Sequence, residues 1–356
     1  MYHACFIRLV ARLNGAVHME FATPTEFDGT RDAALLAPLR IAYESAGDAA
    51  HLIAQPDVLA VIGFGNRPAP ASTAGFVQVD LQPLDPAAPF EVWRGLAPVR
   101  RGRSGAIAWS SNGDYTFASL ELDESANGGI AATAHTAYAM LRNWCLDQPE
   151  RHLLRIWNYL DAINDGSGDD ERYRQFCAGR ASGLEGMFAT GFPAATAIGR
   201  RDGRRVLQLY WLAARMPGAP LENPRQLSAW RYPRRYGPSA PSFARAMRAP
   251  VHDAQIYISG TAAIVGHSSH HAEDCLAQLD ETLANLDSLI GSTRSGGVRH
   301  FGPACALKVY VRHAQDAAEI CARLHERIGT RTPVLLLLGD ICRAELLIEI
   351  DGVYAT

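Results

Sequence analysis

The pattern of apolar and polar residues changes near residue 115. Before that point, short apolar runs at 58–62 and 75–79 lie between clusters of proline, glycine and alanine, which is typical of strands joined by turns. After it, short apolar runs alternate with longer stretches in which apolar residues recur every three to four positions, as in amphipathic helices. The sequence therefore predicts extra N-terminal strands followed by alternating strands and helices.

The regular part of the chain predicts two successive sets of strands and helices. Strands are expected at 116–122, 153–159, 195–199 and 206–213 in the first set, and at 255–265, 306–312, 334–338 and 346–353 in the second. Helices are expected at 130–146, 169–182, 271–290 and 314–328. The Asp202-Gly203 pair between two of these strands predicts a β-hairpin.

The order of these elements predicts an α+β protein with two β-α-β-α-β halves. Each half is expected to be a mixed sheet with helices packed on one face. We expect the first half in residues 1–215, together with the extra N-terminal strands, and the second half in residues 216–356. A chain of 356 residues is long enough for two such domains.

The composition narrows the class of protein. Lys308 is the only lysine among 34 basic residues, and 37 acidic residues bring the net charge to −3 with no long basic run, so we expect no nucleic-acid partner. The seven cysteines form no CxxC pair, which favours a reducing compartment over a disulfide scaffold. No apolar stretch is long enough to span a membrane, and Arg8 and Arg12 interrupt the N-terminus. We therefore expect a cytoplasmic protein without membrane contact.

The expected last strand carries carboxylates on one face. Counting by two places Leu346, Ile348 and Ile350 on one side and Glu349 and Asp351 on the other. If other elements cover the second face, Glu349 loses solvent, which raises the pKa of a carboxyl toward the range useful for a general acid. Composition alone favours the other interpretation, a solvated face with Glu349 at the surface.

Arginine and tyrosine residues are interleaved in two segments. One spans 230–245 on a proline-rich loop, and the other spans 171–180 on an expected helix, where Tyr173 and Arg180 share a face. Such groups suit a small anionic ring compound, because an arginine can bind a carboxylate through two hydrogen bonds. The alternative for most of these arginines is solvation or pairing with a surface acid.

No segment predicts a cofactor. One cluster contains four potential metal ligands: His267, His270, His271 and Glu273. Ser268 and Ser269 stand where a helix N-cap belongs, so capping and a polar helix start explain this segment better. The chain also lacks a dinucleotide-binding fingerprint and a GxxxxGK[ST] phosphate loop. The default interpretation of Cys342 is a buried, inert thiol.

Several longer motifs follow one another between residues 60 and 353. They are Trp157-Asn-Tyr-Leu-Asp-Ala-Ile-Asn164, Glu171-Arg-Tyr-Arg-Gln-Phe-Cys-Ala-Gly-Arg180, Asn223-Pro-Arg-Gln226, residues 232–244, Tyr257-Ile-Ser-Gly-Thr-Ala-Ala-Ile-Val-Gly-His267, Asp340-Ile-Cys-Arg343 and Glu349-Ile-Asp-Gly352. Together they resemble the chorismatase family. The Tyr-Ile-Ser-Gly-Thr and Glu-Ile-Asp-Gly motifs also resemble the wider RidA/YjgF-like fold, whose β-α-β-α-β pattern matches the expected halves.

The resemblance implies an enzyme that cleaves chorismate, a dianion with an enolpyruvyl ether, and releases pyruvate without a metal or organic cofactor. It implies that Glu349 protonates the methylene carbon of the enolpyruvyl group to give an oxocarbenium ion. Cys342 resembles the hydroxybenzoate-forming branch, whereas Ala262 replaces the glycine of 3-hydroxybenzoate formers. This pair fits a member that forms 3- and 4-hydroxybenzoate together. The implied substrate-binding residues are Tyr173, Arg180, Tyr236, Arg245, Ala262 and Arg343.

Three other functions stay open beside the hydroxybenzoate-forming enzyme. A hydrolytic chorismatase would release pyruvate and a dihydroxycyclohexadiene carboxylate. A non-catalytic small-molecule-binding protein would use the same scaffold. An imine deaminase of the RidA/YjgF type would carry an arginine before Leu-Pro, where this chain has Asp340-Ile-Cys-Arg343. The oligomeric state is open between a monomer and a homotrimer.

Overall fold

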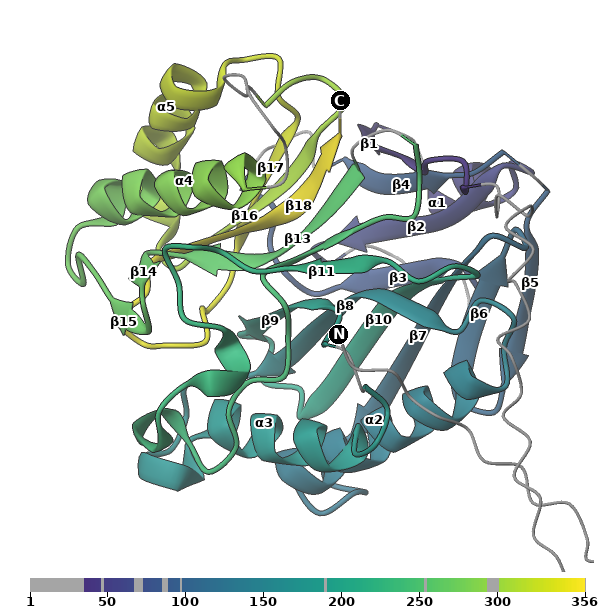
Figure 1. Cartoon of the computed structure of the whole chain (residues 1–356), viewed down its shortest axis with the longest axis horizontal. Helices are drawn as coiled ribbons and strands as arrows, with labels where there is room; N and C mark the ends of the chain where they lie inside the picture. The colour runs from purple at the N-terminus through teal and green to yellow at the C-terminus, as the bar shows by residue number, and fades with distance from the viewer. Residues whose placement is uncertain are drawn as a thin grey trace, which may run out of the picture. The chain divides into compact units, whose positions relative to one another are not determined.

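Three β-sheets of four or more strands, with helices packed against them, make up the described part of the chain (Figure 1). The structure is a computed structural model and describes residues 35–45, 48–66, 73–84, 89–96, 98–188, 191–252, 255–292 and 301–355. All of these belong to one unit, Leu35–Thr356. Within the described ranges, no helix is both long and apolar enough to cross a membrane.

The first sheet contains the N-terminal strands, including the apolar runs expected at 58–62 and 75–79. Its strand order is β1-β4-β2-β3, and only the β2–β3 pair is parallel. Its elements are β1 (Arg40–Glu44), α1 (Ala49–Ile53), β2 (Val58–Phe64), β3 (Phe76–Val79) and β4 (Phe90–Arg94).

The second sheet has the order β5-β6-β7-β10-β8-β9, with a parallel β8–β9 pair and antiparallel pairs elsewhere. Helices α2 and α3 cover one face of it, over a cluster of buried apolar side chains. Its elements are β5 (Arg100–Ser104), β6 (Ile107–Ser111), β7 (Tyr115–Asp123), α2 (Ile130–Leu146), β8 (His152–Asp161), the 3-10 helix η1 (Gly168–Asp170), α3 (Arg172–Gly183), β9 (Ala194–Arg200) and β10 (Val206–Ala214).

The third sheet has the order β11-β12-β13-β18-β16-β17, with a parallel β16–β17 pair. Helices α4 and α5 cover one face of it. Its elements are β11 (Ala219–Leu221), β12 (Ala246–Arg248), β13 (Gln255–Ala262), α4 (Cys275–Gly291), β16 (Ala306–Val311), α5 (Ala317–Ile328), β17 (Val334–Leu338) and β18 (Ile348–Ala355). Smaller elements are β14 (Ile264–Val265), β15 (Ser268–Ser269) and the 3-10 helices η2 (Ala229–Arg231), η3 (Arg234–Tyr236) and η4 (Ala314–Asp316).

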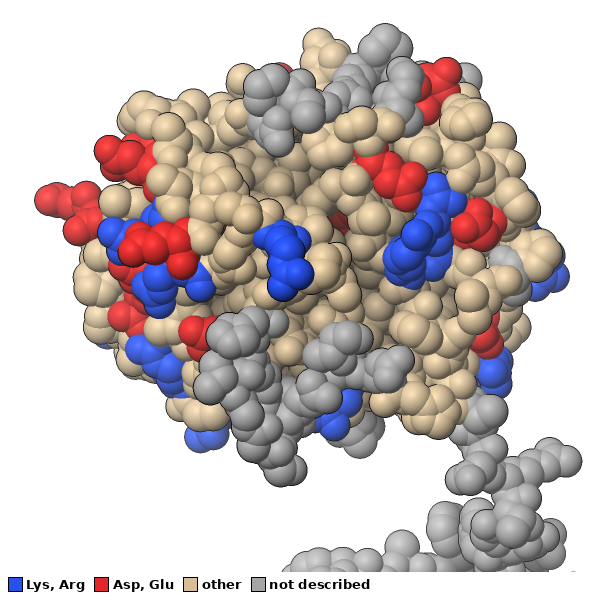
Figure 2. All heavy atoms as spheres, turned by 90° about the horizontal axis from the view of Figure 1, so that it is seen from above, with Lys and Arg blue, Asp and Glu red and all other residues tan. Residues whose placement is uncertain are grey.

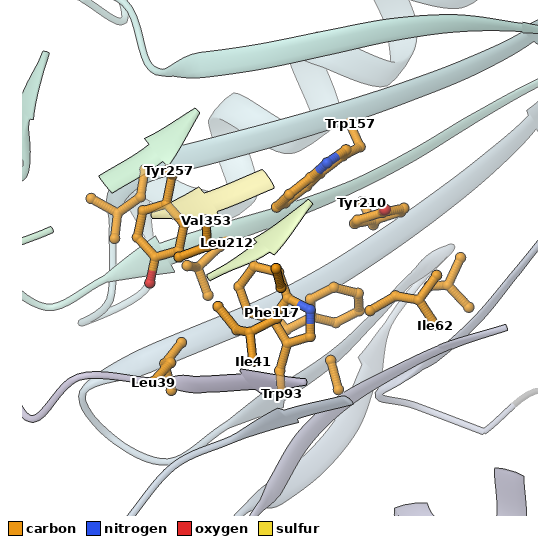
Figure 3. Close-up of a cluster of buried hydrophobic side chains, with 14 of the residues drawn as sticks. Leu39, Ile41, Ile62, Trp93, Phe117, Trp157, Tyr210, Leu212, Tyr257 and Val353 are labelled. Atoms are coloured by element: carbon orange, nitrogen blue, oxygen red, sulfur yellow. The ribbon is translucent and has the colours of Figure 1, made fainter. Parts of the chain in front are cut away.

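The faces of the sheets that carry no helices meet in one aromatic-rich core (Figure 3). Trp93, Trp157 and Tyr257 come from three different sheets. The ring of Trp93 meets Trp157 edge-on at 5.6 Å and stacks on Tyr257 at 6.1 Å. Such aromatic contacts add to the stabilisation from buried apolar area. The middle strands of the second and third sheets are therefore covered on both faces, by helices on one side and by another sheet on the other.

The α+β class, with mixed sheets covered by helices on one face, is confirmed. The prediction of a hairpin around Asp202-Gly203 is wrong, because β9 and β10 do not pair with each other. Strand β8 lies between them and pairs with both. The Asp-Gly pair lies in the connection from β9 to β10, and Gly203 has a positive φ of 72°. A turn signal describes the local chain direction, whereas the order of strands depends on the pairing of β10 with the distant strand β7.

The start of the helix expected at 271–290 is also corrected. This helix, α4, begins at Cys275, and the carboxylate of its N-cap residue Asp274 accepts a hydrogen bond from the backbone of the first turn. Ser268 and Ser269 form the short strand β15 instead, so the predicted capping by these serines is wrong.

Several other element ends differ slightly from the expected positions. Helix α3 begins at Arg172 after the turn η1, and the last strand begins at Ile348. The division into residues 1–215 and 216–356 stays a prediction.

On the face shown in Figure 2, acidic and basic side chains lie beside one another, and neither sign forms a continuous patch.

Candidate active site

Glu349 lies on β18 with its side chain between the second and third sheets. Its neighbours Ile348 and Ile350 pack beneath the helices of the third sheet, so the alternation of the strand turns Glu349 and Asp351 toward the second sheet. Glu349 is 4% exposed and Asp351 is fully buried. The interpretation of this face as solvated is therefore wrong, because another sheet covers it.

Gly260 on the neighbouring strand β13 makes room for the Glu349 carboxyl. The pairing of β13 with β18 is irregular between Ile258 and Thr261, the stretch that contains Gly260. A Cβ atom placed on Gly260 would overlap with Oε1 of Glu349. The carboxyl can occupy this position only because the residue beside it is a glycine.

The surroundings of Glu349 favour its protonated form. Burial, followed by the charge of Asp351, raises the pKa of the Glu349 carboxyl to about 8, although Arg155 and Arg245 act in the opposite direction. At neutral pH, most molecules therefore carry a neutral carboxylic acid at this position. Such an acid has the protonation state that a general acid needs.

A pocket lies beside Glu349. All eight residues singled out from the sequence lie on its wall: Tyr173, Arg180, Tyr236, Arg245, Ala262, Cys342, Arg343 and Glu349. They belong to α3, η3, β13, β18 and the loops before β12 and β18. The aromatic residues Tyr232 and Phe243 also line the pocket. The structure thus brings together residues that are up to 176 positions apart, from Tyr173 to Glu349.

Six further residues of the pocket wall were not predicted as site residues from the sequence: Ala195, Thr196, Ala197, Pro241, Gly260 and Ile264. Thr196 accepts a hydrogen bond from the guanidinium group of Arg155. Gly260 could have been found, because it lies two positions before Ala262 on a strand, where alternate residues share a face. The small residues of β9 carry no chemical signal, so nothing in the sequence assigned them to a site.

Arg180 and Arg245 are buried without carboxylate partners. The guanidinium group of Arg180 donates to the Ser242 carbonyl at 2.9 Å, and that of Arg245 donates to the Leu227 carbonyl at 2.7 Å and to the hydroxyl of Tyr232 at 2.8 Å. Within the described residues, neither side chain forms an ion pair, and both Nε–H groups lack a hydrogen-bond acceptor. These two cations are therefore available to an anionic ligand.

Arg343 is held between two tyrosine rings. Its guanidinium carbon lies 4.1 Å from the ring centre of Tyr236 and 5.3 Å from that of Tyr232. It donates hydrogen bonds of 3.0 Å to the backbone carbonyl of His267 and to the hydroxyl of Ser269. Cation–π contacts and hydrogen bonds fix this arginine in one orientation.

Cys342 and Tyr173 present protonated groups to the pocket. Burial, followed by the nearby Glu349 carboxyl, raises the pKa of the Cys342 thiol well above its usual range. Burial, followed by the thiols of Cys177 and Cys342, raises the pKa of the Tyr173 phenol. Both side chains therefore keep their protons at neutral pH, so Cys342 is not a thiolate nucleophile.

In the histidine cluster, His267 lies next to the pocket wall and forms hydrogen bonds there. Nδ1 of His267 lies 2.9 Å from Nη2 of Arg235 and 3.2 Å from the hydroxyl of Tyr236. Across the described residues, no group of three or more His, Cys, Asp or Glu side chains is arranged to hold a metal ion. His267 instead supports Tyr236, one wall of the pocket.

The pocket places two arginines without carboxylate partners beside a neutral carboxylic acid, an arrangement that suits a small anion. Comparisons with known proteins agree. The family described as "Chorismatase FkbO/Hyg5-like, N-terminal" matches residues 91–213. A chorismatase of Streptomyces rapamycinicus is 37% identical over 278 residues, which cover 74% of this chain and 82% of that protein. A 3-hydroxybenzoate synthase of Streptomyces hygroscopicus is 34% identical over 300 residues, covering 80% and 87% respectively.

A crystal structure of a chorismatase is also similar. It matches with a TM-score of 0.79 and 32% sequence identity, covering 90% of this chain and 99% of that one. The similarity therefore extends over both helix-covered sheets. This protein belongs to the chorismatase family.

Proposed function

We propose that this protein converts chorismate to a hydroxybenzoate and pyruvate, and that Glu349 donates the proton that starts the reaction. The observation that carries the proposal is the buried Glu349 carboxyl, with its pKa raised to about 8, on the wall of a pocket that contains Arg180 and Arg245. The membership of the chorismatase family supports the identity of the substrate.

Chorismate matches the charge of the pocket. It carries two carboxylates on a framework that joins a cyclohexadiene ring to an enolpyruvyl ether. Ion pairs with Arg180 and Arg245 would offset the cost of burying these two cations without a neutralising carboxylate. Tyr236 and Arg343 offer an aromatic and cationic surface to the rest of the molecule.

The reaction needs an acid that is neutral at physiological pH and that touches the substrate. Protonation of the methylene carbon turns the enolpyruvyl ether into an oxocarbenium ion. It leaves Glu349 as a carboxylate, whose charge stabilises the neighbouring cation. A carbon–oxygen bond of the ring then breaks, so that one oxygen leaves with pyruvate, and the ring passes a proton back to the Glu349 carboxylate as it becomes aromatic. Chorismate divides into hydroxybenzoate and pyruvate without gain or loss of atoms, so the reaction consumes no water.

Cys342 supports the hydroxybenzoate branch of this chemistry. Its thiol stays protonated beside Glu349, so it can relay a proton by giving up its own and taking one back while the ring becomes aromatic. The second candidate is the hydrolytic branch, in which water traps the oxocarbenium ion and a dihydroxycyclohexadiene carboxylate results. Ala262 departs from the glycine that the family resemblance implies for 3-hydroxybenzoate formers, so it weakens 3-hydroxybenzoate as the sole product and fits a mixture of 3- and 4-hydroxybenzoate.

Incubation of the purified protein with chorismate tests the proposal. We expect pyruvate, measured by coupling to lactate dehydrogenase, in equal amount to an aromatic acid identified by chromatography and its ultraviolet spectrum. Glu349→Gln should fold normally and lower pyruvate release by about two to four orders of magnitude, the range for loss of a general acid. Glu326→Gln, which changes an exposed carboxyl on α5 outside the pocket, is the matched control and should retain activity.

Three outcomes would change the account. Pyruvate formation by Glu349→Gln at the wild-type rate would overturn the proposed proton donor. A product without the absorption of a benzoate would favour the hydrolytic branch. A wild-type protein that releases no pyruvate from chorismate would overturn the proposed function itself.

A further inference from the structure

A chain of buried charges begins two residues beyond Glu349, at Asp351. Oδ2 of Asp351 accepts hydrogen bonds from Arg155 at 3.1 Å, from the indole of Trp157 at 3.1 Å and from the hydroxyl of Tyr310 at 3.0 Å. Its other oxygen lies 3.5 Å from the ammonium group of Lys308. Two cations and two neutral donors therefore surround this side chain.

Lys308 continues the chain into the first sheet. Its ammonium group lies 2.7 Å from Oε2 of Glu91, whose other oxygen accepts a hydrogen bond of 2.9 Å from Trp93. Burial alone would lower the pKa of the Lys308 ammonium, but the carboxylates of Asp351 and Glu91 outweigh burial and raise it. The side chains of Arg155, Lys308, Asp351 and Glu91 are at most 3% exposed.

The charges of this buried set cancel. Arg155 and Lys308 contribute two positive charges, and Asp351 and Glu91 contribute two negative charges. Ionisation of Glu349 would add a further negative charge beside Asp351, in a region that other sheets shield from water. Such a like charge is costly where the effective dielectric constant is low.

We propose that Asp351 is a positioning residue that keeps the Glu349 carboxyl protonated, and that Arg155 and Lys308, which contact it directly, hold Asp351 in place as a carboxylate. The inference rests on the proposed role of Glu349 as the proton donor. Lys308, the only lysine of the chain, lies outside the pocket and acts on the reaction only through Asp351.

Groups from every neighbouring element face Glu349. Asp351 is the anionic group, and Arg155 on β8 and Arg245 before β12 are the cationic groups. The protonated side chains are Tyr173 of α3, Cys342 of the loop before β18 and Tyr310 of β16, the residue that pairs with Glu349 across the two strands. Burial and Asp351 favour the neutral acid, while both arginines favour the carboxylate. The carboxylate of Asp351 therefore opposes the arginines that the substrate needs, and Glu349 keeps its proton in their presence.

The variant Asp351→Asn tests this inference, because it removes the charge and keeps the shape. In the wild-type enzyme, kcat/KM should be constant below the pKa of Glu349 and should fall as pH rises through about 8. In Asp351→Asn, this fall should move to lower pH by roughly one unit, with about a tenfold loss of kcat/KM on the alkaline side. The double variant Asp351→Asn/Lys308→Met removes one charge of each sign, and it should shift the profile in the same direction if the single variant does not fold.

Glu91→Gln is the matched control. It removes an equally buried carboxylate that shares Lys308 but lies on another sheet, so it should leave the pH profile unchanged even if it lowers stability. A second measurement needs no substrate: infrared titration of the protonated carboxyl band that disappears in Glu349→Gln. This band should be lost near pH 8 in the wild-type protein and at lower pH in Asp351→Asn.

The inference would be overturned if the pH midpoint of the kcat/KM profile and of the carboxyl band were the same in Asp351→Asn as in the wild-type protein. It would also be overturned if Glu91→Gln moved these midpoints as far as Asp351→Asn does. Failure of the wild-type protein to cleave chorismate would refute the proposed function instead. The infrared titration would still decide whether Asp351 controls the protonation of Glu349.

Discussion

At the scale of single residues, the absence of a side chain at Gly260 leaves room for the carboxyl of Glu349. The carboxyl of Glu349 fills the position that a side chain on Gly260 would need. The sequence predicted the face on which Glu349 lies from the alternation of β18. It could not decide whether that face is wet or buried, because the covering residues, such as Thr196, belong to a different sheet.

Gly260→Ala should therefore displace the Glu349 carboxyl. A shift of about 1 Å in a reacting group can cost about a hundredfold in rate, so we expect kcat to fall by that order while the protein stays folded. Steady-state kinetics and thermal unfolding of the variant would measure both effects. Gly291→Ala, at a glycine with open space around its Cβ position, should retain full activity. Equal activity of the two variants would contradict the close packing of Gly260 against Glu349.

We expect Cys342→Ala to change which product forms more than how fast pyruvate is released. If the thiol moves a proton during aromatisation, its loss should change the ratio of 3-hydroxybenzoate, 4-hydroxybenzoate and non-aromatic product more than the total release of pyruvate. Chromatography of the products measures this ratio. Cys321→Ala, on α5 and outside the pocket, is the control. An unchanged product profile in Cys342→Ala would remove the thiol from the mechanism.

At the scale of helices and strands, periodicity predicted what the elements are but not how they are joined. The range expected for α2 agrees with the structure at both ends, because the helix repeats apolar residues on one face. The expected hairpin fails because β10 pairs with β7 and β8, contacts that no local signal encodes. The motifs around residues 171–180 and 230–245 could be assigned to one site only through their resemblance to a family, since their spacing along the chain says nothing about their contact.

The corrected start of α4 gives a prediction for an element. Asp274 accepts the hydrogen bond that begins this helix, so Asp274→Ala should lower the free energy of unfolding by about 1 kcal/mol without changing kcat. Ser268→Ala should not have this effect, because Ser268 lies in β15. Urea denaturation of both variants measures the difference. Equal destabilisation by the two substitutions would place the N-cap elsewhere.

At the scale of the whole described unit, three sheets contribute the buried charges that lie beside the site. Arg155 comes from the second sheet, Lys308 and Asp351 from the third and Glu91 from the first. The composition pointed to Lys308 as the only lysine but gave no reason for it. The reason is tertiary: its ammonium group neutralises carboxylates from two sheets in the absence of solvent.

Lys308→Met should therefore be strongly destabilising. Removing one partner from a buried ion network leaves carboxylates without compensation and costs about 3–5 kcal/mol. The free energy of unfolding in urea measures this loss. The double variant Lys308→Met/Glu91→Gln, in which one carboxylate is also neutralised, should recover part of the stability. A loss below about 1 kcal/mol in the single variant would show that the network contributes little to holding the sheets together.

The central claim is that an exchangeable proton of Glu349 moves to the methylene carbon of the substrate. The most direct test is the reaction of chorismate in deuterium oxide, with the pyruvate reduced at once to lactate and analysed by mass spectrometry. A carboxyl that exchanges with solvent should place one deuterium in the methyl group of nearly every product molecule. A methyl group without deuterium would mean that the hydrogen comes from the substrate ring, and it would contradict the assignment of Glu349 as the acid.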